Sequence, residues 1–393
     1  MIQSRRDVDP HQANDRDRDR EENIIMKNIR IGVINWDASL TRDTYFGYYQ
    51  TRSLSQAKYR TWVPFYADII DEERIDYHFR SVAEYEQELQ YAIDAGIDYF
   101  AFVWYPTEGS LLHEQRSPID CSHRVHELNY ARHLYEKSTL TDKLGMCAIL
   151  SGHPFTDHDL SDLVTAFEKP YYEKIDGRPL LYVYHGNTKE TILHVHALCK
   201  ERGIPTPFTV PMFTSADVLP LADAVSAYAA YNPTDVDRYD ALCRFAIEQD
   251  LRRMQTGKPI IPLFTVGWNP TPRMERLTPW TTNAQGDSIY LQVNYAPAPT
   301  ETELTEGAAV FADHIINNVK EKFAGHILTF AWNEFEEGGY ICPTYREDST
   351  VNDTRIHAFA QTVEIFRSEL ENAKLRYLFL NESFCCKNCW FLI

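Results

Sequence analysis

The chain has 393 residues, a net charge of −18 and an apolar fraction of 44%. This apolar fraction is enough to build a packed core, which excludes a chain that is disordered throughout. No run of about 18 uninterrupted apolar residues occurs, so the sequence predicts no membrane-spanning helix. Because the acidic charge repels phosphate backbones, we expect no nucleic-acid partner.

The amino-terminal segment, residues 1–27, is polar and contains a mixed run of aspartates and arginines. It has no apolar stretch of the kind found in secretory signal peptides, and its composition predicts a disordered tail. Most of the eight cysteines of the chain are scattered rather than arranged as a disulfide framework. This pattern is typical of free thiols in a reducing compartment, and we expect a cytoplasmic protein.

From residue 28 onward, apolar runs typical of buried strands alternate with stretches of helical periodicity. The predicted strands are 29–36, 97–105, 144–150, 179–184, 208–213, 224–228, 260–266 and 326–332. The predicted helices are 82–95, 159–167, 189–202, 238–255, 308–323 and 355–370. Gly96, Gly203 and Gly257 stand at the ends of three of these helices, where glycine is the usual terminator.

This alternation predicts an α/β protein with a single-domain (β/α)₈ TIM barrel. A doubly wound sheet is disfavoured because no glycine-rich phosphate loop follows any of the predicted strands. No proline- or serine-rich linker divides the chain into two parts. We therefore assign residues 1–27 to a disordered tail, 28–370 to a catalytic barrel and 371–393 to a carboxyl-terminal tail.

Polar and aromatic residues follow the carboxyl ends of most of the predicted strands, which is where a barrel of this kind places its reactive side chains. Tryptophan and tyrosine can supply flat walls for sugar rings, and polar side chains can bind hydroxyl groups. The candidate substrate-binding residues are Trp36, Asp37, Trp104, Tyr105, His153, Tyr184, His185, Tyr231, Trp268, Asn269, Arg273, Trp332 and Asn333.

The sharpest signal follows the last predicted strand, where Glu334, Glu336 and Glu337 occur in close succession. Carboxylates this close together disfavour joint ionisation, so the pKa of at least one of them should be raised. Cleavage of a glycosidic bond needs two carboxyl groups with separated pKa values, one on each side of the bond. The segment therefore predicts a glycosidase with a carbohydrate substrate.

Other chemistries have weaker support in the sequence. His153 and His158 are two potential metal ligands, but no helical His pair or carboxylate set accompanies them, and we predict neither a metal nor a cofactor. No Gly-x-Ser-x-Gly motif is present, which disfavours a serine hydrolase. Cys385, Cys386 and Cys389 have no histidine nearby and are one thiol short of a structural zinc site, so we expect an adventitious tail.

Four segments, in order along the chain, resemble the glycoside hydrolase family 99-like proteins, which are labelled WbsX-like in polysaccharide loci. They are residues 92–106, 172–184, 267–273 and 331–343, and the resemblance extends over residues 28–370. This chain differs from the family pattern in having Phe335 where tryptophan is usual, Glu336 as a third acid, and a different opening segment at 34–37.

The resemblance implies a (β/α)₈ barrel that acts on α-linked sugars, typically of mannose type. It also implies that configuration is retained through a 1,2-anhydro-sugar intermediate. Matched to this sequence, Glu334 would take the proton from the 2-hydroxyl of the sugar. Glu337 would be the general acid and then the base for water.

We therefore expect a metal-independent, endo-α-mannosidase-like glycoside hydrolase that cleaves a polysaccharide or an oligosaccharide. One alternative is a glycosyltransferase-like enzyme of surface polysaccharide biosynthesis, such as the O-antigen of lipopolysaccharide. Another is a barrel that binds glycans without catalysis. The sequence makes no prediction of the oligomeric state.

Overall fold

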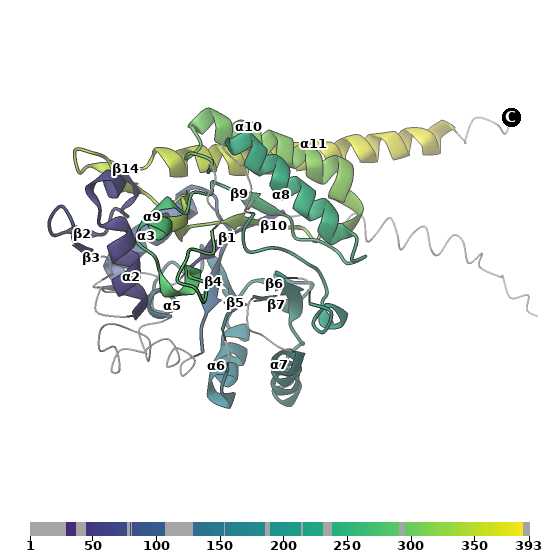
Figure 1. The fold of residues 1–393 in the computed structure, drawn as a ribbon. Coiled ribbons are helices and arrows are strands. Elements are labelled where there is room, and N and C mark those ends of the chain that lie inside the picture. The colour runs from purple at the N-terminus through teal and green to yellow at the C-terminus, as the bar shows by residue number, and fades with distance from the viewer. Residues whose placement is uncertain are drawn as a thin grey trace, which may run out of the picture.

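The computed structural model of the protein describes residues 29–36, 45–76, 79, 81–106, 129–152, 154–184, 189–213, 215–230, 238–290 and 295–387. At its centre lies a sheet of parallel strands with helices on both sides (Figure 1). In spatial order these strands are β8 (Phe208–Pro211), β7 (Arg178–Val183), β5 (Gly145–Leu150), β4 (Tyr99–Trp104), β1 (Arg30–Asn35), β10 (His326–Phe330) and β9 (Leu263–Thr265). Each coincides with a predicted strand, and the described residues form a mixed α/β fold.

The strands of this sheet are buried along nearly their whole length, as their continuous apolar runs predict. Strand β1 lies between β4 and β10 and pairs with both in parallel, through Gly32↔Tyr99 and Arg30↔His326. A Cβ atom at Gly32 would come within 2.1 Å of the Tyr99 ring. Glycine at this position therefore leaves room for a large aromatic side chain next to the middle strand.

The sixth predicted strand, 224–228, is reduced to a single parallel bridge between Val225 and Ile260. On one side, the amide of Ser226 donates to the carbonyl of Pro211 at 3.1 Å, at the end of β8. On the other, the amide of Ile261 donates to the carbonyl of Val225 at 3.0 Å, just before β9. The segment thus bonds to β8 and to the chain just before β9, but for too few residues to form a regular ladder.

All six predicted helices are present, with ends that differ from the expected ones at some positions. They are α3 (Val82–Asp94), α6 (Asp157–Phe167), α7 (Lys189–Glu201), α8 (Tyr239–Met254), α10 (Glu301–His314) and α11 (Thr354–Lys387). Gly96, Gly203 and Gly257 follow helices α3, α7 and α8 with φ angles of 75°, 68° and 80°. These left-handed conformations explain why glycine ends each helix.

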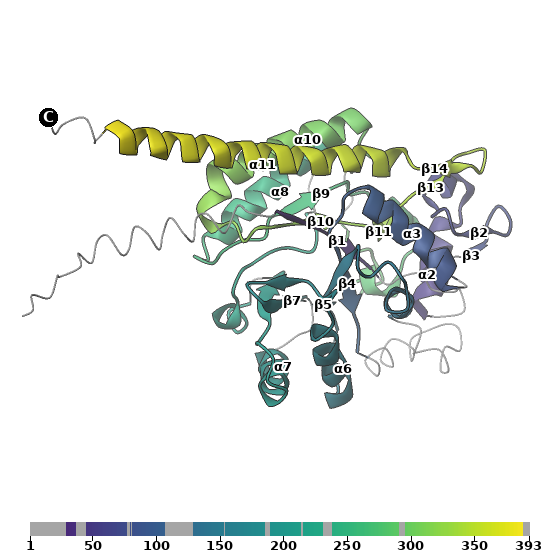
Figure 2. The same cartoon turned by 180° about the vertical axis from the view of Figure 1, so that it is seen from behind.

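The last two helices depart most from the predicted ranges. Helix α10 begins seven residues early because Thr300 and Glu303 form a capping box, and its end continues as a π-turn over Ile315–Val319. Helix α11 extends to Lys387 rather than to residue 370 and crosses α10 along one side of the molecule (Figure 2). No described helix is both long enough and apolar enough to span a membrane.

Shorter elements fill the connections between the strands and the long helices. They are α2 (Tyr45–Leu54), η1 (Ala57–Trp62), β2 (Asp68–Ile69), β3 (Ile75–Asp76), α5 (Tyr130–Tyr135), β6 (Lys174–Ile175), η3 (Leu219–Leu221), α9 (Thr271–Glu275), η4 (Pro279–Thr281), η6 (Lys320–Lys322), β11 (Asn333–Glu334), η7 (Phe335–Glu337), β12 (Gly339–Tyr340), β13 (Thr344–Tyr345) and β14 (Val351–Asn352). Strand β6 pairs antiparallel with β7, and β11 forms a small antiparallel ladder with β12.

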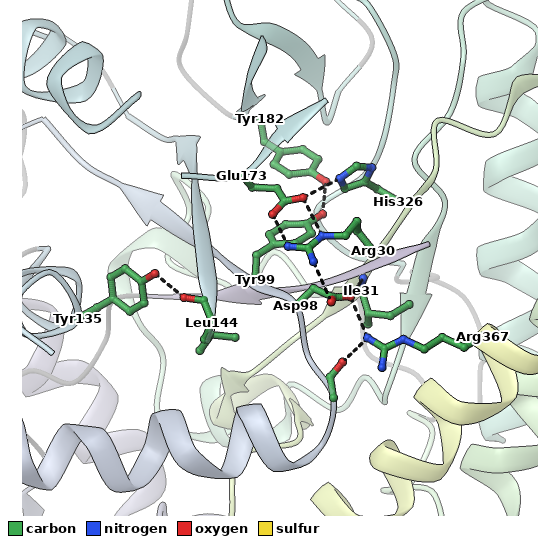
Figure 3. Close-up of polar contacts among 11 residues, drawn as sticks. Arg30, Ile31, Asp98, Tyr99, Tyr135, Leu144, Glu173, Tyr182, His326 and Arg367 are labelled. Carbon is green, nitrogen blue, oxygen red and sulfur yellow. Dashed lines mark hydrogen bonds and ion pairs between the residues drawn. The ribbon is translucent and has the colours of Figure 1, made fainter. Parts of the chain in front are cut away.

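A network of paired charges lies at the amino ends of the parallel strands (Figure 3). Arg30 donates two hydrogen bonds to Glu173, at 3.0 and 2.7 Å, and a third to Asp98 at 3.0 Å. His326 contacts Glu173 at 3.1 Å, and Arg367 of α11 reaches Asp98 at 3.0 Å. Burial opposes ionisation of Glu173, but the hydrogen bonds from His326 and Arg30 hold its pKa below the usual value. Each carboxylate here therefore has partners from two basic side chains.

Candidate active site

The three clustered glutamates lie on a tight hairpin just after β10. Strand β11 turns through η7 into β12, with Glu334 opposite Gly339. Gly338 closes the turn in a left-handed conformation, and a Cβ atom there would lie only 3.0 Å from the backbone nitrogen of Asn269. Gly338 therefore allows the hairpin to fold closely against the chain that follows β9, and Gly339 leaves room for the ring of Phe330 in β10. This packing places Glu334, Glu336 and Glu337 beside helix α9.

Arg273 of α9 lies among these three acids. Its Nη1 donates to Oε1 of Glu337 in a short contact, and its Nη2 lies 3.4 Å from Oε2 of Glu334 and 3.7 Å from Oε2 of Glu336. Only 4% of the arginine is exposed, and the exposed fractions of the three glutamates are 3%, 0% and 6% in chain order. One buried guanidinium is thus shared among three buried carboxyl groups.

The loop before α9 fixes the position of Arg273. Asn269 Oδ1 accepts a hydrogen bond from the backbone nitrogen of Thr271 at 3.2 Å, which is an Asx-type turn. The backbone nitrogen of Asn269 donates to the carbonyl of Glu337 at 2.6 Å, which ties this loop to the acidic hairpin. Asn269 therefore shapes the site through the backbone, whereas Arg273 contributes its charge directly.

Two tyrosine hydroxyl groups bind the outer glutamates. Tyr228 donates to Oε1 of Glu334 at 2.6 Å, and Tyr290 donates to Oε1 of Glu337 in a short contact. The ring of Tyr184 stacks against Tyr228 with centroids 4.3 Å apart. Glu334 and Glu337 are therefore each held by one arginine contact and one phenol.

The charge balance of this cluster shifts the ionisation of its acids. Burial and the neighbouring charge of Glu337 raise the pKa of Glu334 to about 8, against the opposing effect of Arg273. Burial raises the pKa of Glu336 to about 6. The predicted rise of at least one pKa in this cluster is thus present, and its main cause is burial, with like-charge repulsion second.

An aromatic wall adjoins the acids on the side of β1. Trp36 is fixed by Asn333, whose side chain accepts from the Trp36 amide at 2.8 Å and donates to the Trp36 carbonyl at 2.6 Å. The indole nitrogen of Trp36 donates to the hydroxyl of Tyr105 at 2.5 Å. The guanidinium of Arg273 lies 5.1 Å from the ring of Trp36, and Trp280 packs edge-on to the same ring at 6.3 Å.

The other predicted tryptophans are placed differently. Trp332 is fully buried, and its indole donates to Glu88 at 2.6 Å, so it belongs to the core and offers no surface to a ligand. Its position after β10 predicts a strand-end side chain, but the ring packs inward at 5.0 Å from Phe100. Trp268 packs against Tyr290 at 5.7 Å, and Trp104 is covered by the guanidinium of Arg132 at 3.7 Å.

Four of the predicted substrate-binding residues lie outside the described residues, namely Asp37, His153, His185 and Tyr231. The side chains of Cys385 and Cys386, and residue Cys389, are likewise not described. Among the described residues, no three His, Cys, Asp or Glu side chains are grouped so that they could hold a metal ion.

Several residues of the site are not among the predicted site residues. Tyr228 ends the sixth predicted strand, and this position was a signal that could have identified it. Tyr290 and Trp280 come from the long connection between β9 and α10, which carries no periodic pattern. Gln50, which lies 3.4 Å from Glu336, belongs to α2, a helix that the apolar spacing does not predict.

The fold is similar to that of known glycoside hydrolases. No protein-family model matches the chain, and no curated protein matches it in sequence. A GH99 endo-alpha-mannosidase from Bacteroides thetaiotaomicron, solved in complex with Bis-Tris propane, is 13% identical, with a TM-score of 0.51 over 87% of this chain and 98% of that one. A glycoside hydrolase-like protein is 11% identical, with a TM-score of 0.50 over 86% of this chain and 94% of that one. The resemblance to the family 99-like proteins is thus confirmed at the level of the fold.

Proposed function

We propose that this protein is a glycoside hydrolase that uses Glu334 and Glu337 to cleave an α-linked polysaccharide or oligosaccharide. The observation that carries the proposal is the convergence of these two buried carboxyl groups on Arg273, just beyond the carboxyl end of β10. The fold that the chain shares with a GH99 endo-alpha-mannosidase supports the same class of activity.

The proposal includes a closed (β/α)₈ barrel. The segment around Val225 supports closure because its hydrogen bonds reach β8 on one side and the chain before β9 on the other. In a closed barrel, the side chains that follow the strands converge on one mouth. This would place Tyr228, Arg273 and the acidic hairpin around a common substrate.

In the proposed first step, Glu334 takes the proton from the 2-hydroxyl of the sugar, and that oxygen attacks C1. The bond from C1 to the leaving oxygen breaks as the new C1–O2 bond forms. Glu337 gives its proton to the leaving oxygen. The products of this step are a 1,2-anhydro sugar and a free alcohol.

In the second step, Glu337 takes a proton from water, whose oxygen attacks C1. The C1–O2 bond breaks, and O2 recovers a proton from Glu334. Both glutamates return to their starting states, and the two inversions at C1 retain the configuration. The net reaction consumes one water molecule and needs no other reactant.

The ionisation of the free site bears on how this reaction begins. The raised pKa of Glu334 favours its protonated form in the free site, whereas the first step needs Glu334 ionised and Glu337 protonated. Because the two acids interact, the proton belongs to the pair rather than to one residue. We propose that the bound sugar moves this proton from Glu334 to Glu337, by presenting its 2-hydroxyl to the former and its glycosidic oxygen to the latter.

The proposed substrate is a mannose-type glycan, because the structural neighbour is an endo-alpha-mannosidase. Trp36, Tyr105 and Trp280 form an aromatic surface beside the acids. Such a surface suits the apolar face of a sugar ring, and Asn333 holds it at a fixed position. The cytoplasmic location and a role in surface polysaccharide metabolism remain predictions from the sequence.

The test is a screen of α-mannan oligosaccharides and a wider glycan library, with products identified by mass. We expect a shortened glycan with a new reducing end from the wild-type protein, and about 10²–10⁴-fold slower formation of this product by Glu337→Gln. Glu88→Gln is a matched control, because Glu88 is equally buried but binds Trp332 rather than Arg273. Transfer of sugar from a nucleotide donor, or tight glycan binding with no product, would contradict the proposal.

A further inference from the structure

The third acid of the hairpin, Glu336, has no part in the proposed reaction, although it is the most deeply buried of the three. Its Oε2 lies 3.4 Å from Nε2 of Gln50, and its Oε1 has no hydrogen-bond partner among the described residues. Oε1 of Gln50 and Nε of Arg273 also lack hydrogen-bond partners among those residues. A carboxyl group this poorly satisfied is costly to bury as a charge, which is why its pKa is raised to about 6.

Glu336 and Glu334 compete for the same nitrogen of Arg273. Nη2 lies 3.4 Å from Oε2 of Glu334 and 3.7 Å from Oε2 of Glu336, whereas Nη1 is committed to Glu337. Both Nη2 distances are longer than an ordinary charge-assisted hydrogen bond. The guanidinium edge is therefore divided between two carboxyl groups and fully satisfies neither.

We propose that Glu336 is a positioning residue, which disfavours the ionised form of Glu334 by competing with it for Nη2 of Arg273. It acts through Arg273 and through its own charge, and it does not contact the substrate. This inference rests on the proposed function, because the protonation of Glu334 matters through its role in the reaction. When Glu336 is ionised, it attracts the guanidinium of Arg273 and repels a negative charge on Glu334. When Glu336 is neutral, Arg273 can stabilise the charge on Glu334.

Among the charged groups that face Glu336, Arg273 has the largest effect on the ionisation of this acid. Helix α9 contributes Arg273, and the hairpin itself contributes Glu334 and Glu337. Helix α2 presents the neutral amide of Gln50, and β12 contributes Tyr340, whose ring packs on Phe335 at 5.2 Å. Arg273 is the cation that acts on this acid.

The sign of the effect follows from these contacts. Replacing Glu336 with glutamine removes a negative charge beside Glu334 and releases Nη2 of Arg273. Both changes favour the ionised form of Glu334, so its titration midpoint should fall. Whichever limb of the pH–rate profile Glu334 controls should move to lower pH by the same amount.

The experiment is a titration of ¹³C-carboxyl-labelled full-length protein by NMR, with the Glu334 signal assigned from its loss in Glu334→Gln. We expect Glu336→Gln to lower the Glu334 midpoint by at least about half a pH unit. Glu88→Gln should leave the midpoint unchanged, because Glu88 is buried but does not contact Arg273. If Glu336→Gln does not fold, Glu336→Met tests the same loss of charge with an apolar side chain of similar size.

An unchanged Glu334 midpoint in a folded Glu336 variant would overturn the inference, and so would an equal shift in Glu88→Gln. The titration needs no substrate, so its result is independent of the glycosidase assay. Absence of turnover on any glycan counts against the proposed function alone. A pH–rate profile of active protein then provides the second readout, and a limb that moves to lower pH in Glu336→Gln supports the inference.

Discussion

Both ends of the central sheet carry buried acidic side chains around an arginine, but in different proportions. At the amino ends, Glu173 and Asp98 share Arg30, and each has one further nitrogen partner, His326 for Glu173 and Arg367 for Asp98. At the carboxyl end, three glutamates share Arg273. The pKa of Glu173 is lowered in the first network, whereas those of Glu334 and Glu336 are raised in the second. The two networks therefore differ in how many carboxyl groups share one arginine, and their pKa shifts have opposite directions.

The largest expected effect is on activity at the carboxyl end. Glu337→Gln should reduce turnover of oligosaccharides by about 10²–10⁴-fold, because a general acid–base contributes that much. An aryl glycoside with a good leaving group needs little acid assistance in the first step, so the variant should keep most of the wild-type rate for the first release of the aryl group. The rates of the first step on the two substrates make the comparison. Equal losses on both would remove Glu337 from the role of acid.

The next effect is on stability at the amino end. Glu173→Gln leaves Arg30 and His326 without their shared carboxylate. The free energy of unfolding should fall by about 2–4 kcal/mol, which is less than for a fully buried pair because Arg30 is partly exposed. Glu275→Gln is the control, since its exposed pair with Lys58 is worth at most about 1 kcal/mol. Urea unfolding at pH 7 measures both. A Glu173 variant as stable as the control would show that the amino-end network does not stabilise the fold.

The two networks should also respond to pH in opposite directions. Because the pKa of Glu173 is lowered in the folded state, its contribution is present above the unfolded value of about 4.3 and is lost as the pH falls below it. The pKa of Glu334 is raised to about 8, so folding is favoured at low pH and loses stability as the pH rises from about 4.3 to about 8.

Glu334→Gln isolates the second of these responses. The variant should lose less stability than the wild-type protein between pH 5 and pH 9, because glutamine carries no charge to bury. Urea unfolding at these two pH values is the measurement. If both proteins have the same pH dependence, Glu334 is not the buried acid described above.

The smallest expected effect concerns the phenol that holds Glu334. Tyr228→Phe removes the 2.6 Å hydrogen bond that lowers the pKa of Glu334, so the limb of the pH–rate profile that Glu334 controls should move to higher pH. Turnover should fall about 10-fold, in line with a hydrogen bond to a charged group. Tyr59→Phe removes a comparable bond to Glu275, an acid that pairs with Lys58, and should change neither. A limb that moves to lower pH would reverse this assignment.

The sequence predicts the parallel strands and the long helices well, because strands that are buried on both faces appear as continuous apolar runs. It also predicts the acidic hairpin, since polar residues that directly follow a buried strand meet at one end of a parallel sheet. The sixth strand, 224–228, is the exception, because a run of small apolar residues does not specify how long its backbone pairing lasts.

The partners of the acids are harder to predict from sequence. Tyr290 and Trp280 lie in an irregular connection, where no periodicity indicates which side chains turn inward. Trp332 is the opposite case, because it is predicted at the site but lies in the core. Its position after a strand does not indicate whether the side chain faces the site or packs inward against Glu88. The sharing of Arg273 among three acids depends on distances between α9 and the hairpin, which only the fold sets.

The most direct test of the central claim is cleavage of an α-mannan oligosaccharide in H₂¹⁸O, followed by mass analysis of the products. If Glu334 and Glu337 hydrolyse a glycosidic bond, the wild-type protein incorporates one ¹⁸O at each new reducing end, and Glu334→Gln and Glu337→Gln form labelled product at least about 10²-fold more slowly. Labelled product from both variants at the wild-type rate would contradict the account.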